Sequence, residues 1–181
     1  MKSRLLITGF GPFPGVPDNP AAALVSHIAQ SGLPVSTEIL PTEWAICQRM
    51  PGLARSVTRL LMFGVASEAR RIRYERVAHP VADALPDAVG ALPDGAPIMS
   101  RRSAMPIAVL RAAARREGFP VSVSHSPGRY ICNASYAAAL SGNPHTLFVH
   151  IPEPSGRGSQ SFEVLKDHAL WLAAVLASDR V

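Results

Sequence analysis

Three reactive side chains stand at or just beyond the ends of strands that the sequence predicts. Cys132 lies at or near the start of a helix, directly after the turn that follows a strand at 121–124. His150 ends an apolar strand, and Glu75 lies beyond the end of a strand at 60–64. Because functional side chains gather at the carboxyl ends of strands in doubly wound sheets, we expect these three to meet. A thiolate nucleophile, an imidazole base and a carboxylate that orients the imidazole form a hydrolase triad.

The two cysteines differ in the surroundings that the sequence predicts for them. At a helix start, unsatisfied amide groups and the helix dipole favour the thiolate form of Cys132. Cys47 lies within a predicted helix beside Ala45 and Ile46, where no dipole favours a thiolate, so we interpret it as structural. The residues alone leave a second interpretation of Cys132 open, because a single cysteine in an apolar chain is more often a small buried side chain.

Strand-like runs alternate with helical runs along the chain, which is the pattern of an α/β protein with a mostly parallel sheet. The predicted strands cover residues 5–8, 35–40, 60–64, 121–124 and 146–151. Helices are predicted to begin near Asn19, Trp44, Ser103, Cys132 and Ser161. Pro51-Gly52 should break or kink the second helix, and the stretch after Gly64 is expected to be irregular. We therefore predict an α/β fold of one domain over residues 1–181, with a parallel or mixed twisted sheet sandwiched between helices.

Composition excludes several classes of protein. The 181 residues are 48% hydrophobic and 17% charged, which favours a well-buried single domain over a disordered chain. No apolar run approaches the ~18 residues of a membrane span, so we expect a cytoplasmic protein without membrane contact. Two cysteines are too few for a disulfide framework and are not clustered like metal ligands, so we expect no metal site.

The net charge of +5 comes from 18 basic and 13 acidic residues. Arginines gather in short groups at 70–76, 101–102 and 111–116, and these groups belong to separate predicted elements. Aromatic residues make up only 6% of the chain and provide no stacking platform between the groups. We therefore expect no nucleic-acid partner and interpret the arginines as solvated or site-lining side chains.

Four motifs occur in order across nearly the whole chain. They are residues 6–13 followed by Asn19-Pro20, then Glu75-Arg76-Val77-Ala78, Gly128-Arg129-Tyr130-Ile131-Cys132-Asn133 and Phe148-Val149-His150-Ile151-Pro152. These motifs resemble those of the pyroglutamyl peptidase I family of cysteine peptidases. Pro86-Asp87 and Ala104-Met105-Pro106 are similar to two further segments of the family. The resemblance implies that Cys132 is the nucleophile, that His150 is the general base and then acid, and that Glu75 orients His150.

The resemblance also implies how a substrate is held. Phe10 and Phe13 would flank the flat lactam ring of an N-terminal pyroglutamate, and Asn19 would hold the loop that carries them. Aromatic faces suit an uncharged and partly apolar ring. The alternative for both phenylalanines is ordinary packing in the core beneath the loop. A backbone donor at Cys132, together with Arg70, would hold the oxyanion.

The chain departs from the family in residues around the implied triad. Val65 stands where the family usually has a glutamine, which leaves an apolar wall beside the lactam edge. Residues 67–69 replace the family's glycine-glycine-arginine, so that Arg70 comes one place late, and Pro80 replaces an asparagine. The arginine that precedes Pro86-Asp87 in the family is missing. These departures bear on the identity of the substrate more than on the class of activity.

We therefore predict a cysteine exopeptidase that removes an N-terminal pyroglutamyl residue from peptides through a thioester. This prediction implies a peptide partner, no metal or organic cofactor and, as in other family members, a homo-oligomer. Two alternatives stay open: a cysteine amidase that acts on another cyclic or acylated amine, and a non-catalytic small-molecule-binding protein of the same fold. A phosphate-binding loop at residues 9–15 is disfavoured, because the glycine spacings of nucleotide-binding loops are missing there.

Overall fold

Six strands form one mixed sheet in the part of the chain that the computed structural model describes, which is residues 3–13, 15–154 and 160–178. The strands are β1 (Ser3–Phe10), β2 (Ser36–Leu40), β3 (Val57–Val65), β4 (Ile72–Glu75), β7 (Val121–Ser124) and β8 (Thr146–Ile151). Their order in the sheet is β2-β1-β3-β8-β4-β7. Strands β2, β1, β3 and β8 are parallel, whereas β4 pairs antiparallel with β8 and parallel with β7.

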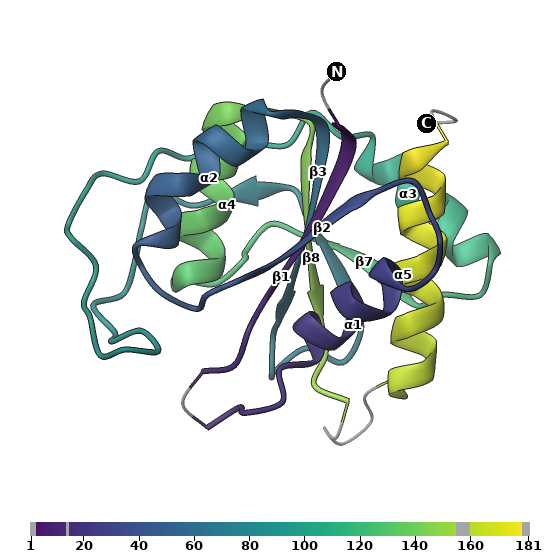
Figure 1. The fold of residues 1–181 in the computed structure, drawn as a ribbon, viewed down its shortest axis with the longest axis horizontal. Coiled ribbons are helices and arrows are strands. Elements are labelled where there is room, and N and C mark those ends of the chain that lie inside the picture. The colour runs from purple at the N-terminus through teal and green to yellow at the C-terminus, as the bar shows by residue number, and fades with distance from the viewer. Residues whose placement is uncertain (1–2, 14, 155–159, 179–181) are drawn as a thin grey trace.

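Helices cover both faces of this sheet. They are α1 (Pro20–Ala29), α2 (Ile46–Arg55), α3 (Ile107–Arg116), α4 (Ile131–Gly142) and α5 (Phe162–Ala177). Figure 1 shows α2 and α4 on one side of the sheet, and α1, α3 and α5 on the other. The α/β fold class predicted from the sequence, with a mixed sheet sandwiched between helices, is confirmed.

The stretch after β3 is more regular than the sequence analysis predicted. Residues Ile72–Glu75 form β4, and β5 (Val77–Ala78) pairs with β6 (Arg101–Arg102) in a two-stranded antiparallel ribbon. Strand β4 is four residues long, and both of its partners, β7 and β8, come much later in the chain. The expectation of irregular structure was wrong here, because pairing between distant segments stabilises a strand too short for a local pattern to predict.

Pro51 does not break α2, so of the two outcomes predicted from the sequence, a break or a kink, the break was wrong. The helix runs from Ile46 to Arg55 with Pro51 inside it. A proline within a helix removes one amide donor, but α2 packs along α4 and buries Met50 and Ala54. Gly142 makes this close packing possible, because a Cβ atom at Gly142 would lie only 2.3 Å from the carbonyl oxygen of Pro51.

Alternation along the strands decides which side chains lie beside α4. In β3, Leu60 and Met62 pack in a core cluster with α2 and α4, whereas Leu61 and Phe63 pack in a second cluster with α1, α3 and α5. Successive side chains of a strand point to opposite faces of the sheet. In β8, Phe148 packs in the cluster with α2 and α4, and His150, two residues later, therefore points to the same face.

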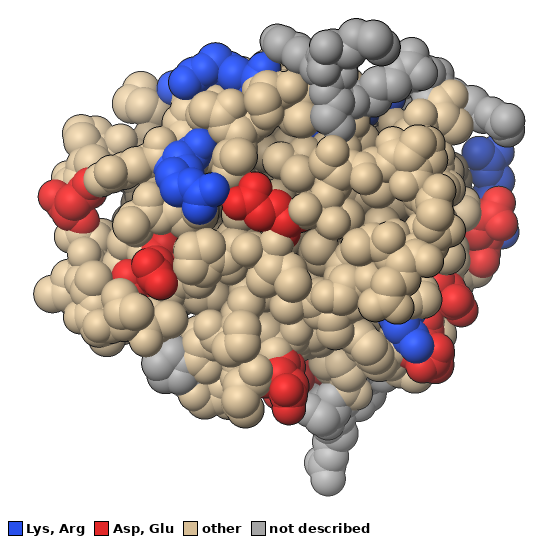
Figure 2. All heavy atoms as spheres, viewed as in Figure 1, with Lys and Arg blue, Asp and Glu red and all other residues tan. Residues whose placement is uncertain are grey.

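No helix in the described residues is long and apolar enough to cross a membrane. On the face shown in Figure 2, lysine and arginine side chains are separated by uncharged residues and by aspartate and glutamate. The described residues of that face therefore carry no continuous basic stripe of the kind that nucleic-acid binding needs.

Candidate active site

His150 and Glu75 meet because β4 runs antiparallel to β8. The register places Arg73 opposite His150 and Glu75 opposite Phe148, so that Glu75 is the diagonal neighbour of His150 on the α4 face. His150 Nδ1 lies 2.8 Å from Glu75 Oε1. Glu75 is fully buried and His150 is 4% exposed. This contact is a charge-assisted hydrogen bond shielded from water, which fixes the orientation of the imidazole ring.

Cys132 enters the same face from α4. It is the second residue of that helix, after Tyr130 at the N-cap, and its side chain is partly buried. Its sulfur lies beside Gly64, which pairs with His150 in the register of β3 and β8. A Cβ atom on Gly64 would lie 3.1 Å from Cys132 Sγ. The missing side chain of Gly64 therefore leaves the space in which the thiol stands next to the imidazole.

The environment of His150 changes its acidity. Burial lowers the pKa of His150, but hydrogen bonds to Cys132 and Glu75, together with the negative charges of those two groups, outweigh it and raise the pKa to about 9. The imidazole is therefore protonated at neutral pH. Because Nδ1 bonds Glu75, Nε2 is the nitrogen left for the Cys132 thiol. An imidazolium next to a cysteine favours the thiolate, which is the nucleophilic form.

Cys47 has the opposite environment. Burial, and to a smaller extent the charge of Asp94, raises the pKa of the Cys47 thiol to about 12. Cys47 lies in α2 and lines a cavity that none of Cys132, His150 and Glu75 lines. The thiol of Cys47 is therefore protonated and unreactive at neutral pH.

Two buried side chains of α4 tie this helix to the segment that carries Glu75. The hydroxyl of Tyr136 donates to the carbonyl oxygen of Glu75 at 2.8 Å. Asn133 Oδ1 accepts from the amide of His79 at 2.7 Å, and its Nδ2 donates to the carbonyl oxygen of Val81 at 2.8 Å. These bonds fix the distance between the helix with the thiol and the strand with the carboxylate.

Sequence reasoning assigned no role to Asn133 or Tyr136. The signal for Asn133 was its place directly after Cys132 in the motif 128–133. Tyr136 follows Cys132 by four residues, about one helical turn, which places both side chains on the same side of α4.

Phe10 and Asn19 are both buried at the loop after β1. The Phe10 ring is 3% exposed and packs in the core, with its centroid 6.5 Å from that of Phe148. This placement matches the packing alternative for Phe10, because its ring is covered by other side chains. Asn19 Nδ2 donates to the carbonyl oxygen of Gly11 at 2.9 Å, while its Oδ1 accepts from the amide of Ala21 at 2.9 Å. Asn19 thereby joins the loop to the start of α1.

Phe13 and Val65 line a hollow of about 370 Å³ together with Val16, Ser67 and neighbouring residues. The Val65 side chain packs against the cluster of α1, α3 and α5, on the face opposite Gly64. The structure therefore does not bring Val65 onto the face of Cys132, because it ends β3 one residue after Gly64 and strand side chains alternate.

Arg70, the predicted oxyanion donor, is exposed in the connection between β3 and β4. A different arginine stands closer to the imidazole in the fold. Arg73 lies opposite His150 in the strand register, and its Nη1 is 2.8 Å from Glu68 Oε1. The pKa of the Glu68 carboxyl is lowered: burial acts to raise it, but hydrogen bonds from its own backbone and from Arg73, with the charges of Arg73 and His150, outweigh that effect.

Among the described residues, no group of three or more His, Cys, Asp and Glu side chains is placed to hold a metal ion.

Comparison with known proteins agrees with the fold and the motifs. The model of the pyroglutamyl peptidase family matches residues 3–153. The pyrrolidone-carboxylate peptidase of Chromobacterium violaceum is 32% identical over an alignment that covers 82% of this chain and 77% of the relative. The pyrrolidone-carboxylate peptidase of Vibrio vulnificus strain YJ016 is 31% identical over an alignment that covers 90% of this chain and 87% of the relative.

Solved structures with the same name have the same fold. The pyrrolidone carboxyl peptidase of Fervidobacterium islandicum AW-1 superimposes with a TM-score of 0.86 at 26% identity, over 97% of this chain and 98% of that protein. Pyroglutamyl peptidase I of Bacillus amyloliquefaciens gives a TM-score of 0.81 at 28% identity, over 99% and 97% of the two chains. With a family match over most of its length and the same fold over nearly all of it, this chain belongs to the pyroglutamyl peptidase family of cysteine peptidases.

Proposed function

We propose that this protein removes an N-terminal pyroglutamyl residue from peptides, with Cys132, His150 and Glu75 acting as a catalytic triad. The observation that carries the proposal is the 2.8 Å contact between His150 Nδ1 and Glu75 Oε1, with Cys132 hydrogen-bonded to the same imidazole. Family membership supports the reaction, and this geometry supports the roles of the three residues.

The reaction proceeds in two halves. The Cys132 thiolate attacks the carbonyl carbon of the pyroglutamyl residue, and the C–N bond breaks as His150 gives its proton to the leaving amine. The shortened peptide departs and a thioester remains on Cys132. His150, now neutral, takes a proton from a water molecule whose oxygen attacks the thioester carbonyl. Cleavage of the C–S bond releases pyroglutamate and restores the thiolate and the imidazolium, while Glu75 holds the ring in place.

The start of α4 supplies a donor for the oxyanion. Cys132 lies in the first turn of that helix, where amide groups have no acceptor within the helix. The Cys132 amide therefore stabilises the negative charge that develops on the carbonyl oxygen, as an oxyanion hole does. Arg70 stays a predicted second donor. Its side chain is exposed in the connection between β3 and β4, so it would have to approach the substrate from the solvent side.

The lactam ring is proposed to occupy the hollow that Phe13 and Val65 line. Its volume of about 370 Å³ is in the range of small-molecule sites. Val65 directly follows Gly64, beside which the Cys132 sulfur stands, so that the hollow lies at the same end of β3 as the nucleophile, on the opposite face of the sheet. Asn19 keeps the Phe13 loop in place through Gly11, and Phe10 supports the site from below by packing against Phe148.

A fluorogenic pyroglutamyl amide, assayed under reducing conditions, tests the proposal. Cys132→Ser and His150→Ala should each abolish turnover. Cys47→Ser is the matched control, since it removes the other thiol of the chain and should leave turnover unchanged. Full activity in Cys132→Ser would refute the mechanism. A panel of amides with other acyl groups, tested in parallel, separates pyroglutamyl hydrolysis from the cysteine amidase alternative.

Alkylation by iodoacetamide tests the chemistry of the two thiols without a substrate. At pH 7, Cys132 should react fast, while Cys47 should react slowly because its pKa is raised to about 12. Slow and equal labelling of both cysteines would favour the non-catalytic binding protein. The homo-oligomer and the cytoplasmic location expected from the sequence stay predictions.

A further inference from the structure

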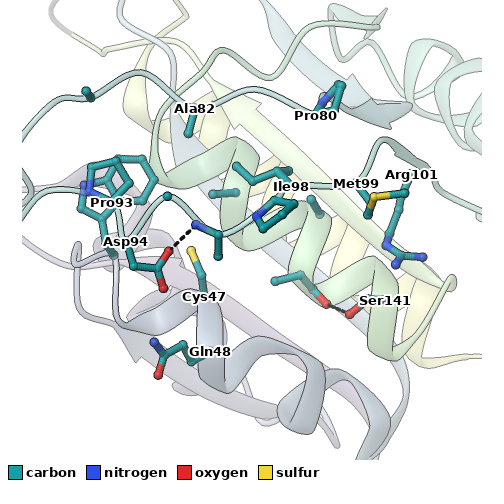
Figure 3. A pocket seen from close by; sticks show the side chains of 18 residues that line it. Cys47, Gln48, Pro80, Ala82, Pro93, Asp94, Ile98, Met99, Arg101 and Ser141 are labelled. Atoms are coloured by element: carbon teal, nitrogen blue, oxygen red, sulfur yellow. Dashed lines mark hydrogen bonds between the residues drawn. The ribbon is translucent and has the colours of Figure 1, made fainter.

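A cavity of about 640 Å³ lies behind α4, between α2, α4 and the segment from Pro80 to Arg101 (Figure 3). Its floor consists of small side chains of α4 at helical spacing, namely Ala134, Ala137, Ala138 and Ser141. Around the axis of α4, Cys132 lies about half a turn from these four positions, so their side chains point away from it. The cavity is therefore separate from the proposed catalytic site, although the same helix borders both.

The roof of this cavity is the segment from Pro80 to Arg101, and hydrogen bonds to Trp44 and Tyr130 hold part of it in place. Trp44 donates its amide to Asp87 Oδ2 and its indole N–H to the carbonyl oxygen of Leu85, both at 2.9 Å. The Tyr130 hydroxyl donates to the carbonyl oxygen of Pro86 at 2.8 Å. These bonds fix residues 85–87, which connect the lining residues Ala84 and Pro93, so the protein itself holds this part of the roof in place. The volume is that of a preformed small-molecule site.

The lining is apolar in the middle and charged at two separate ends. Figure 3 shows Asp94 beside Cys47 at one end and Arg101 beside Met99 at the other. Asp94 Oδ1 accepts from the amide of Ala96 at 2.9 Å, which fixes the carboxylate at the rim. An occupant that complements this lining has an apolar body, a positive group near Asp94 and a negative group near Arg101.

Among molecules with an apolar body and two opposite charges, a peptide is the one that the backbone of the roof favours. Residues 97–100 have no regular secondary structure and lead directly into β6. Within the described part of the chain, the amides of Ile98, Met99 and Ser100 have no hydrogen-bond partner. An extended peptide can pair with an exposed backbone segment of this kind, as in strand addition to a sheet edge.

We propose that this cavity binds a short apolar peptide with free termini, with its ammonium group toward Asp94 and its carboxylate toward Arg101. Each exposed ion pair contributes modestly, so removal of either charge from the peptide should weaken binding about two- to fivefold. Peptides with a new free amino terminus are also what the proposed hydrolysis releases. Binding at this cavity does not require that reaction.

Tryptophan fluorescence reports on the cavity directly. The chain has two tryptophans, and Trp44 lines the cavity. Trp171→Phe leaves Trp44 as the only one. Leu-Leu, N-acetyl-Leu-Leu and Leu-Leu amide are titrated into this variant. The Trp44 signal should saturate with all three peptides, and the two that lack a terminal charge should bind two- to fivefold more weakly.

Variants of the two charged residues assign each terminus. Asp94→Asn should make Leu-Leu and N-acetyl-Leu-Leu bind equally, while Leu-Leu amide still binds more weakly. Arg101→Gln should do the converse. Arg102→Gln is the matched control, because Arg102 is the next residue of β6 and lines a different hollow with Arg76 and Met105. It should leave all three affinities unchanged.

Three results would overturn the proposal. One is a Trp44 signal that no peptide changes, and another is equal affinity for the three peptides in the Trp171→Phe protein. The third is a signal that follows protein concentration instead of peptide concentration, with a matching dimer in sedimentation, which would assign the surface to a second copy. None of these results alters turnover of the pyroglutamyl amide, so failure here is distinct from failure of the proposed function.

Discussion

Gly64→Ala should lower kcat/KM about 100-fold while leaving the enzyme folded. The added Cβ would lie 2.8 Å and 2.9 Å from two atoms of the Phe148 ring and 3.1 Å from Cys132 Sγ. Contacts between carbon atoms are favourable at about 3.5–4.0 Å, so the ring or the thiol has to move by roughly 0.5–1 Å. Gly64 cannot yield easily, because β3 is paired on both sides, with β1 and β8.

The Phe148 ring has no free direction in which to move. It is fully buried, and its centroid lies 4.7 Å from that of His150 and 5.5 Å from that of Tyr136. If the Phe148 ring moves, it therefore displaces the imidazole of His150. If the Cys132 sulfur moves instead, the contact between the thiol and the imidazole changes directly. A misplacement of about 1 Å at a reacting group can cost ~10²-fold in rate. Overpacking of a core typically costs about 1–3 kcal/mol of unfolding free energy.

The assay compares kcat/KM for the pyroglutamyl amide with urea unfolding of the same protein. Gly11→Ala is the matched control, because a Cβ there would meet only Ile39 and Leu40 at 3.5 Å, an ordinary contact. We expect kcat/KM to fall about 100-fold in Gly64→Ala and less than threefold in Gly11→Ala. Adding Phe148→Leu to Gly64→Ala should restore part of the activity, since it removes the ring atoms that clash. A Gly64→Ala protein with wild-type kcat/KM would refute this account of how the thiol is placed.

The other predictions concern the charges and hydrogen bonds around the same core. Because hydrogen bonding and charge from Glu75 help to raise the pKa of His150 to about 9, kcat/KM should decline as pH rises through about 9, and Glu75→Gln should move that decline about 1–2 pH units lower. Tyr136→Phe removes the donor to a buried carbonyl oxygen, so urea unfolding should show a loss of about 1–3 kcal/mol, and Cys132 alkylation at pH 7 should slow. Burial lowers the pKa of His168 to about 3. The neutral His168 side chain therefore contributes its full share to the free energy of unfolding above the unfolded pKa of ~6.5, and this share is lost as pH falls toward 3. The unfolding free energy of the wild type should fall between pH 8 and pH 5 by about 2 kcal/mol more than that of His168→Gln, and equal falls would contradict this assignment.

Much of the fold follows from local patterns in the sequence. Asn19-Pro20 marks the start of α1, and the Asn19 side chain does cap the helix, because a short polar side chain before a proline satisfies a free amide of the first turn. Apolar runs predicted residues 5–8 of β1, residues 60–64 of β3 and all of β8, since strands buried on both faces are nearly continuous in apolar residues. The start of α4 at Cys132 was predicted to within one residue.

Local patterns failed where a contact between distant segments decides the structure. Pro51-Gly52 predicted a break or a kink in α2, yet the helix continues without a break to Arg55 where it packs against Gly142 of α4. Phe10 and Val65 were expected beside a substrate on account of their types and motif positions. Their roles toward a substrate stay predictions, but the fold decides how each side chain lies: the Phe10 ring is buried, and strand alternation turns Val65 to the face opposite Gly64.

The sequence by itself determined which side chains are available for chemistry: a cysteine at a helix start, a histidine at the end of an apolar strand and a glutamate within a short motif. Only the tertiary structure decided that they meet. Glu75 reaches His150 because β4 runs antiparallel to β8, and Cys132 reaches the same imidazole because Gly64 leaves room for its sulfur. Hydrogen bonds within a helix or a turn join near neighbours and leave a mark on the local sequence. Pairing between strands 75 residues apart leaves none, because it depends on the stability of the whole sheet.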